Sequence, residues 1–219
     1  MPVSNYISTD IKVLRLKDSI NKARSLFSVS TLTHLPVVKK NTLVGMLSGN
    51  DALNLELEKE SIKNHTNLLQ NFSATNSTVW IDLIKLFVTN QANILPVVDK
   101  NRVYLGYFDL NDILHLFSET PFLSYNGYML VVEKNTLEYS FSEISQIVEA
   151  NNAKLLGAFV TKQDMDTIQV TLKLSDHDIN NTLQSFRRYN YHVIAGNLED
   201  KYFEELKNRS DYLQKFLNI

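Results

Sequence analysis

The stretch "HLPVVKKNTLVGMLSGNDAL", residues 34–53, is written a second time as "NILPVVDKNRVYLGYFDLNDIL", residues 93–114. Pro36 matches Pro96 at an offset of 60, and Gly45 matches Gly106 at an offset of 61, because the second turn has one extra residue. Upstream, apolar positions three and four apart in residues 20–27 match those in residues 80–87, a spacing typical of one helix face. The sequence therefore predicts two copies of one unit, at about residues 1–60 and 61–118.

Each copy is predicted to contain a helix, a strand, a turn, a return strand and a closing helix. "LPVV" is typical of a short buried strand, and "KKNT" and "DKNR" are typical of turns. Gly45 and Gly106 fall inside strands, where glycine lets another backbone or a ligand come close. A unit of about 60 residues buries little surface and is only marginally stable alone. We therefore expect the copies to pack face to face and to share a core.

The doubled pattern of "PVV", a strand glycine and a helix-opening "S-x-x-D" resembles a tandem pair of CBS (cystathionine β-synthase) domains, known as a Bateman module. The resemblance covers roughly residues 1–118. It implies a disc with two clefts, in which AMP, ADP, ATP or S-adenosylmethionine binds as a regulatory ligand. It also implies that binding regulates an attached domain or an unidentified partner protein.

The first cleft is predicted from "SGND". Ser48 precedes a helix with Asp51 three residues later, which is a capping-box-like pattern. Alternatively, the helix N-terminus and the serine hydroxyl hold a phosphate, and the aspartate accepts hydrogen bonds from a ribose. The resemblance implies the second interpretation, and it places strand residues along the same cleft: His34, Leu35, Pro36 and Val37. His34 either faces the cleft or is a hydrogen-bonded structural residue.

The second cleft is predicted to differ, because "DLND" places Asp109 where the first copy has Ser48. A carboxylate about 4 Å from a phosphate repels it by roughly 4 kcal/mol at an effective dielectric constant of about 20. That energy corresponds to about a thousandfold in affinity. Asp112 remains as a ribose acceptor, and the resemblance places Asn93, Ile94 and Pro96 along this cleft. We therefore expect one nucleotide per chain.

A different pattern follows the junction at residues 118–127. Strands are predicted at 128–133, 154–161, 167–175 and 191–196, with helices at 140–152 and 178–190. The order βαββαβ is that of a ferredoxin-like fold. Alternation in 167–175 predicts a half-exposed strand, and Phe141, Ile144 and Val148 are predicted on one face of the first helix.

Residues 127–197 resemble an ACT domain, and the whole arrangement is similar to bacterial acetoin-utilisation-type CBS–ACT proteins. The loop "EKNTLEYS" lacks the glycine that such ligand loops carry, which favours a structural or dimerising role. Residues 198–219 are predicted to form an amphipathic helix that packs on its own domain or on a second copy. The expected fold class is thus α+β/α/β: two β-α-β-β-α repeats, a ferredoxin-like βαββαβ domain and a C-terminal helix. A homodimer is also expected.

The composition of the chain argues against several classes of protein and site. The chain has no cysteine, which excludes disulfides and thiolate sites. A net charge of −2 does not indicate nucleic acid, and the pairs Lys39–Lys40 and Arg187–Arg188 are interpreted as solvated faces. No apolar run approaches the roughly 20 residues that span a membrane, and the start is not typical of a signal peptide, so a cytoplasmic protein is expected.

No catalytic constellation is recognisable in the sequence. The six glycines form neither a P-loop nor a dinucleotide fingerprint, and the five histidines show no metal-ligand spacing. We therefore expect a non-catalytic, small-molecule-sensing protein with no metal and no required cofactor. The alternative is a dimeric interaction or scaffold protein whose ligand clefts are degenerate.

Overall fold

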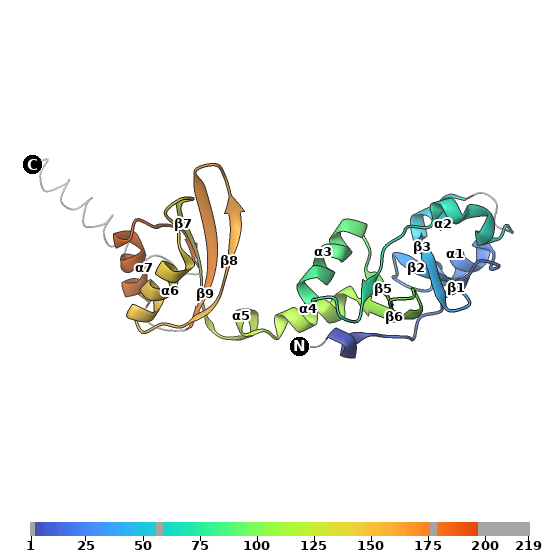
Figure 1. The fold of residues 1–219 in the computed structure, drawn as a ribbon, viewed down its shortest axis with the longest axis horizontal. Coiled ribbons are helices and arrows are strands. Elements are labelled where there is room, and N and C mark those ends of the chain that lie inside the picture. Colours follow the sequence, from blue (N-terminus) through green and yellow to red (C-terminus); the bar gives the residue numbers. More distant parts are fainter. Residues whose placement is uncertain (1–2, 56–58, 176–178, 197–219) are drawn as a thin grey trace, which may run out of the picture. The chain divides into compact units, whose positions relative to one another are not determined.

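The structure is a computed structural model that describes residues 3–55, 59–175 and 179–196. The chain divides into two compact units, Met1–Phe117 and Ser118–Ile219, which are described separately. Figure 1 shows both units as a ribbon whose colours follow the sequence.

The first unit contains the predicted repeat. The first copy consists of η1 (Val3–Tyr6), β1 (Leu14–Arg15), α1 (Ile20–Ser28), β2 (His34–Lys39), β3 (Thr42–Ser48) and α2 (Gly49–Asn54). The second consists of η2 (Ile62–Leu68), β4 (Ala74–Thr75), α3 (Trp80–Asn90), β5 (Ile94–Val98), β6 (Tyr104–Asp109) and α4 (Leu110–Ser118). Each copy forms a three-stranded sheet, β1-β2-β3 or β4-β5-β6, in which the first pair is parallel and the second antiparallel.

The segment that leads into each copy pairs with the sheet of the other copy. Gln70, which precedes β4, forms a bridge to Met46 of β3, with N–O distances of 2.8 and 2.9 Å. Ser8, which precedes β1, bridges Tyr107 of β6 in the same way, with both distances 2.9 Å. The two copies are therefore interlocked rather than merely packed against each other. These two lead-in stretches, residues 7–9 and 69–71, are called the crossing segments below.

The strand glycines lie under these crossing segments. A Cβ atom at Gly45 would come 2.9 Å from the Cβ of Leu69, and one at Gly106 would come 2.5 Å from the carbonyl oxygen of Ser8. Gly106 also has a φ of +149°, which side chains disfavour. The sequence left open whether backbone or ligand approaches these glycines, and the structure places backbone there.

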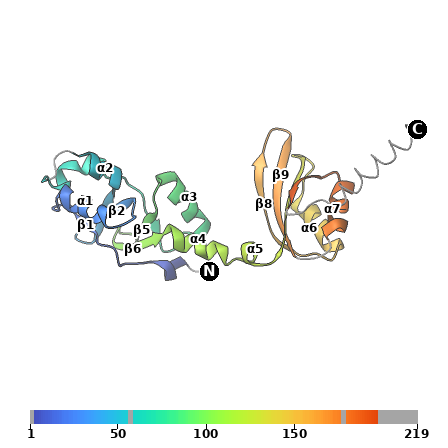
Figure 2. The ribbon, with the colours of Figure 1, turned by 180° about the vertical axis from the view of Figure 1, so that it is seen from behind.

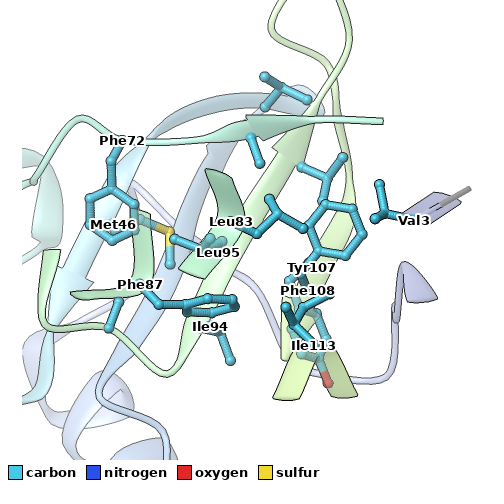
Figure 3. Close-up of a cluster of buried hydrophobic side chains, with 14 of the residues drawn as sticks. Val3, Met46, Phe72, Leu83, Phe87, Ile94, Leu95, Tyr107, Phe108 and Ile113 are labelled. Carbon is cyan, nitrogen blue, oxygen red and sulfur yellow. The ribbon is translucent and has the colours of Figure 1, made fainter. Parts of the chain in front are cut away.

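The largest apolar core of this unit draws on both copies, as expected. Val38, Leu43 and Met46 of the first copy pack with buried residues of the second, among them Phe87 and Phe108. Figure 3 shows Met46 among the aromatic side chains of this cluster. A smaller cluster is built on α1, β2 and β3 of the first copy and also includes Ile62 of η2. The shared core supplies the burial that neither copy reaches alone.

The second unit has the predicted order βαββαβ. After α5 (Pro121–Ser124) come β7 (Gly127–Asn135), α6 (Phe141–Ala150), β8 (Leu155–Gln163), β9 (Thr167–Ser175), α7 (Ile179–Arg188) and β10 (His192–Gly196). The sheet is antiparallel in the order β10-β7-β9-β8, the ferredoxin-like arrangement. Figure 2 shows α6 and α7 together on one face of this sheet, and the core beneath them includes Val170, Leu172 and Phe186.

Three details of this unit differ from the sequence prediction. Phe141 is 42% exposed, because it is the first helical residue, and Ile147 completes the buried stripe with Ile144 and Val148. Thr171 and Lys173, on the other face of β9, are buried rather than exposed. Both side chains contact the neighbouring strands: the Thr171 hydroxyl donates to Thr161 of β8, and the Lys173 ammonium donates to the Gly127 carbonyl of β7.

The junction also packs on this second face of the sheet. The ring of Phe122 in α5 lies 5.4 Å from the ring of Phe159 in β8, and it occupies the space where Gly157 has no side chain. The predicted helix at 198–219 lies outside the described residues. Within the described ranges, no helix has the length and apolar character needed to cross a membrane.

Candidate functional site

Ser48 and Asp51 form a closed pair at the start of α2. Ser48 is the N-cap, with φ −79° and ψ 150°, and its hydroxyl oxygen accepts a hydrogen bond from the Asp51 N–H at 3.0 Å. The same hydroxyl donates to Oδ2 of Asp51 at 2.6 Å. The structure thus contains the cap geometry, and one carboxylate oxygen, Oδ1, makes no hydrogen bond to the described residues.

The N–H groups at this helix start are largely engaged. The Gly49 N–H donates to the Thr33 carbonyl at 2.8 Å, and the Asp51 N–H is taken by Ser48. We expected free N–H groups for a phosphate; instead, the neighbouring strand and the cap bind two of them. The site is therefore better suited to a hydroxyl donor such as a ribose than to a phosphate.

His34 lies beside this pair, opposite Ser48 in the β2–β3 register. Its side chain is 4% exposed; Nδ1 lies 2.9 Å from the Thr33 hydroxyl, Nε2 lies 3.2 Å from Oε1 of Gln70, and the ring meets Phe72 edge-on. Burial lowers the pKa of His34, although the hydrogen bond to Gln70 and the charge of Asp51 act in the opposite direction. A buried, neutral, hydrogen-bonded histidine fits the structural interpretation.

The other strand residues predicted for the clefts point into the cores. Leu35 and Val37 belong to the core cluster of the first copy, and Ile94 belongs to the shared core. Pro36 and Pro96 are buried at register positions opposite Met46 and Tyr107. Of the predicted first-cleft residues, only Asp51 is more than marginally accessible.

The equivalent place in the second copy is acidic. Oδ1 of Asp109 accepts from the Asn111 N–H at 2.7 Å, while Asp112 is exposed in the first turn of α4. The Tyr107 hydroxyl donates to Asp10 at 2.6 Å. Burial raises the pKa of Tyr107, and the charges of Asp10 and Asp109 raise it further. Two carboxylates therefore lie near enough to raise the pKa of this tyrosine. The first copy has Met46, which does not ionise, in the matching position.

Sequence reasoning missed the polar contact between the two copies. The Asn93 side chain accepts from the Thr33 N–H and hydroxyl and donates to the Thr31 carbonyl, and the Asn93 N–H donates to the Thr33 hydroxyl. Thr33 and Asn93 are 60 residues apart, so the repeat offset itself was the signal that they occupy equivalent positions. In the described part of the chain, no three His, Asp or Glu side chains gather as metal ligands.

Comparison with known protein families gives a match in the first copy. Residues 3–58 match the family model of the CBS domain. This CBS-matched stretch holds η1, both strands of the first hairpin, and the Ser48–Asp51 pair. The second copy repeats its elements and its strand order. A homoserine O-acetyltransferase from Methanococcus vannielii is 29% identical over 117 residues, 51% of this chain, and the chain spans only 24% of that protein's length.

Several solved structures are similar over about half of this chain. The CBS domains of a transcriptional regulator from Streptococcus pneumoniae show 18% identity and a TM-score of 0.46, over 52% of this chain and 98% of that one. A CBS domain pair/ACT domain protein from Thermotoga maritima shows 20% identity and a TM-score of 0.48, over 54% and 98%. CBSX2 from Arabidopsis thaliana, solved also with AMP, shows 23% identity and a TM-score of 0.46 in that complex, over 53% and 95%.

Proposed function

We propose that the first unit is a non-catalytic sensor that binds an adenosine compound through its ribose beside Asp51. The carrying observation is the arrangement of this half-buried carboxylate: Ser48 holds Oδ2, and Oδ1 is left for a further donor. Its place within the CBS-matched stretch supports the proposal. AMP, ADP, ATP and S-adenosylmethionine all carry the required vicinal hydroxyls, so the ribose contact alone does not select among them.

The same reasoning makes the two clefts unequal. In the second copy Asp109 replaces the neutral Ser48, and Asp10 adds a further negative charge near Tyr107. A phosphate placed there would meet like charges at short range, which costs several kcal/mol in a partly buried site. We therefore expect one phosphate-bearing ligand per chain.

Titration calorimetry of the full chain with AMP and with adenosine tests this proposal. The expected result is one site per chain, at least a tenfold loss of affinity in Asp51→Ala, and little change in the matched control Asp112→Ala. Asp51→Asn is a second variant that keeps the side-chain volume. Unchanged AMP affinity in both Asp51 variants, or AMP binding that only Asp112→Ala weakens, contradicts the assignment.

A second candidate is an interaction protein whose clefts are closed, and one observation favours it. Ser48 and Asp51 satisfy each other in the structure, as do Thr33 and Asn93, so these groups have a structural role without any ligand. Absence of AMP, ATP and S-adenosylmethionine binding at millimolar concentration, in protein whose fold is intact, would favour this candidate.

We propose that the second unit is ACT-like and dimerises the chain. Its edge strand β8 pairs with β9 on one side, and Phe159 and Val160 on this strand are 46% and 37% exposed. Exposed edge strands pair readily with a second chain. Light scattering after gel filtration tests this proposal, and a mass near 25.2 kDa at micromolar concentration would contradict it.

A further inference from the structure

A second site of different chemistry lies at the opposite end of β2 from Ser48. A cavity of about 820 Å³ is walled by three segments of the first unit: the end of β1 with the residues after it, the β2–β3 turn, and the start of η2. These segments contribute five cations: Arg15, Lys17, Lys39, Lys40 and Lys63. Val13, Leu16 and Val38 supply an apolar floor. We call this cavity the basic pocket.

No carboxylate lines the basic pocket, and its five cations form no ion pair within the described residues. The nearby acid, Asp18, forms an ion pair with Lys22 at 2.8 Å and accepts from the Arg15 N–H at 2.9 Å. Its charge also attracts the Arg15 side chain, and it offsets part of the positive charge at this edge of the pocket. Five positive side chains around one cavity repel one another, and in a protein of net charge −2 this local excess is not a reflection of overall composition.

The backbone of the basic pocket is fixed before any ligand arrives. The Leu16 carbonyl accepts from the Ser61 hydroxyl at 2.6 Å and from the Lys63 N–H at 2.9 Å, which ties η2 to the end of β1. On the facing wall, Lys40 and Asn41 have φ values of 48° and 67°, as a tight hairpin turn requires. The Tyr104 N–H donates to the Asn41 carbonyl at 2.7 Å, so the second copy holds this turn.

The second copy shows that the fold does not need these charges. At the repeat offset of 60, Arg15, Lys17 and Lys39 correspond to Thr75, Ser77 and Asp99, whereas Lys40 corresponds to another lysine, Lys100. In the second copy these side chains form hydrogen bonds within local turns. Asp99 accepts from the N–H groups of Asn101 and Val103, and the Thr75 and Ser77 hydroxyls share a hydrogen bond. In two sheets of the same topology, three cations of the first copy are thus replaced by neutral or acidic residues in the second. Structure alone does not account for the difference.

We infer that the basic pocket binds a small anion carrying several phosphate groups. A single phosphate cannot contact cations on three separate walls, whereas a chain of two or three phosphates can. The volume lies in the range of small-molecule sites, and the apolar floor offers contact area for an organic group. The overall charge of −2 does not favour a nucleic acid as the occupant. This site is separate from Asp51, so the inference does not rest on the proposed function.

Titration of the full chain with inorganic triphosphate tests the inference, with citrate as a carboxylate comparator. We expect one triphosphate per chain, weaker binding of citrate, and at least a tenfold loss of triphosphate affinity in Lys39→Gln/Lys40→Gln. The matched control is Lys85→Gln/Lys100→Gln, which changes the net charge equally outside the pocket and should stay within about twofold of the unmodified protein. Raising the salt concentration should weaken triphosphate binding.

Two further measurements separate the sites and the ligand classes. Asp51→Ala should leave triphosphate affinity unchanged, and Lys39→Gln/Lys40→Gln should leave adenosine affinity unchanged. The inference is overturned by absence of triphosphate binding at millimolar concentration, or by an equal loss in the control pair. It is also overturned if a single-stranded oligonucleotide binds more tightly than triphosphate and loses affinity in the pocket variant, since the pocket would then belong to a nucleic-acid surface.

Discussion

Thr33 and Asn93 occupy the same position in the two copies and bind each other. The Thr33 N–H donates to the Asn93 carboxamide oxygen at 2.9 Å, and the Asn93 N–H donates to the Thr33 hydroxyl at 3.0 Å. Their own carbonyls then accept from Gly49 and Leu110, the first residues of α2 and α4. One contact between equivalent positions of the two copies therefore sets the start of both closing helices, and with them the position of Asp51.

The Thr33–Asn93 contact can be tested by truncation. Asn93→Ala removes several hydrogen bonds at a partly buried position, so the free energy of unfolding should fall by about 1–2 kcal/mol. Trp80, the single tryptophan, lies in the first unit and reports its unfolding by fluorescence in urea. Asn67→Ala is the control, because that exposed side chain makes no hydrogen bond to the described residues. Equal stabilities of the two variants would contradict the role assigned to Asn93.

Gly106 should tolerate no side chain. Gly106→Ala places a Cβ 2.5 Å from the Ser8 carbonyl oxygen and 2.6 Å from Ile7, at a φ of +149°, so we expect a loss of about 3 kcal/mol as the crossing segment is displaced. Gly49→Ala is the matched control, since its Cβ would meet only the Phe27 ring at 3.3 Å in a helical position. Urea unfolding followed by Trp80 fluorescence distinguishes them, and a Gly106→Ala protein as stable as Gly49→Ala would refute the packing described for β6.

The stability of the first unit should depend on pH through His34. Burial keeps the folded-state pKa of His34 below its unfolded value of about 6.5. As the pH falls below about 6.5, the unfolded chain binds the proton first, so stability present above that pH is lost toward the folded-state pKa. Urea unfolding from pH 7.5 to 5.5 should show this decline, and His34→Gln should reduce its slope. The same slope in both proteins would mean that other groups cause the decline.

Asp109→Ser should make the second cleft resemble the first. The substitution removes one negative charge and restores the residue type of Ser48, and serine remains a good helix N-cap. Calorimetry with AMP should then change from one site per chain toward two, with the new site weaker because Asp10 remains near Tyr107. Asp109→Asn is a useful companion, since it removes the charge and keeps the shape. If neither variant gains a site, charge at residue 109 does not close the second cleft.

Local patterns in the sequence predicted the elements well where they depend on near neighbours. Alternating residues located β9 at 167–175, and helical spacing located the buried Ile179, Leu183 and Phe186 of α7. The strand glycines predicted that another group approaches these strands closely. They did not identify that group, because the crossing segments come from residues distant in the chain. For the same reason neither the burial of Thr171 nor the engaged N–H of Gly49 was predictable.

The candidate sites also differ in whether they depend on near neighbours or on residues distant in the chain. "SGND" predicted both the cap and a ribose acceptor, and the structure contains the cap, while the ribose contact stays a prediction. The basic pocket was not predicted, because Arg15, Lys39 and Lys63 lie in separate segments that only the folded sheet brings together. The pair Lys39–Lys40, read alone, is indistinguishable from any solvated turn.

The crossing segments also govern the order in which this chain can fold during its synthesis. The sheet of the first copy is incomplete until Gln70 has been made, because the N–H and the carbonyl of Met46 form their hydrogen bonds with Gln70. Ser8 cannot form its bridge until Tyr107 has been made, 99 positions later. Domains generally fold as units during synthesis, and such distant pairing is slow. The two copies of the first unit therefore cannot fold one after the other during synthesis. The unit completes its fold late and in a single step, and residues 7–9 are among the last to form their strand pairing.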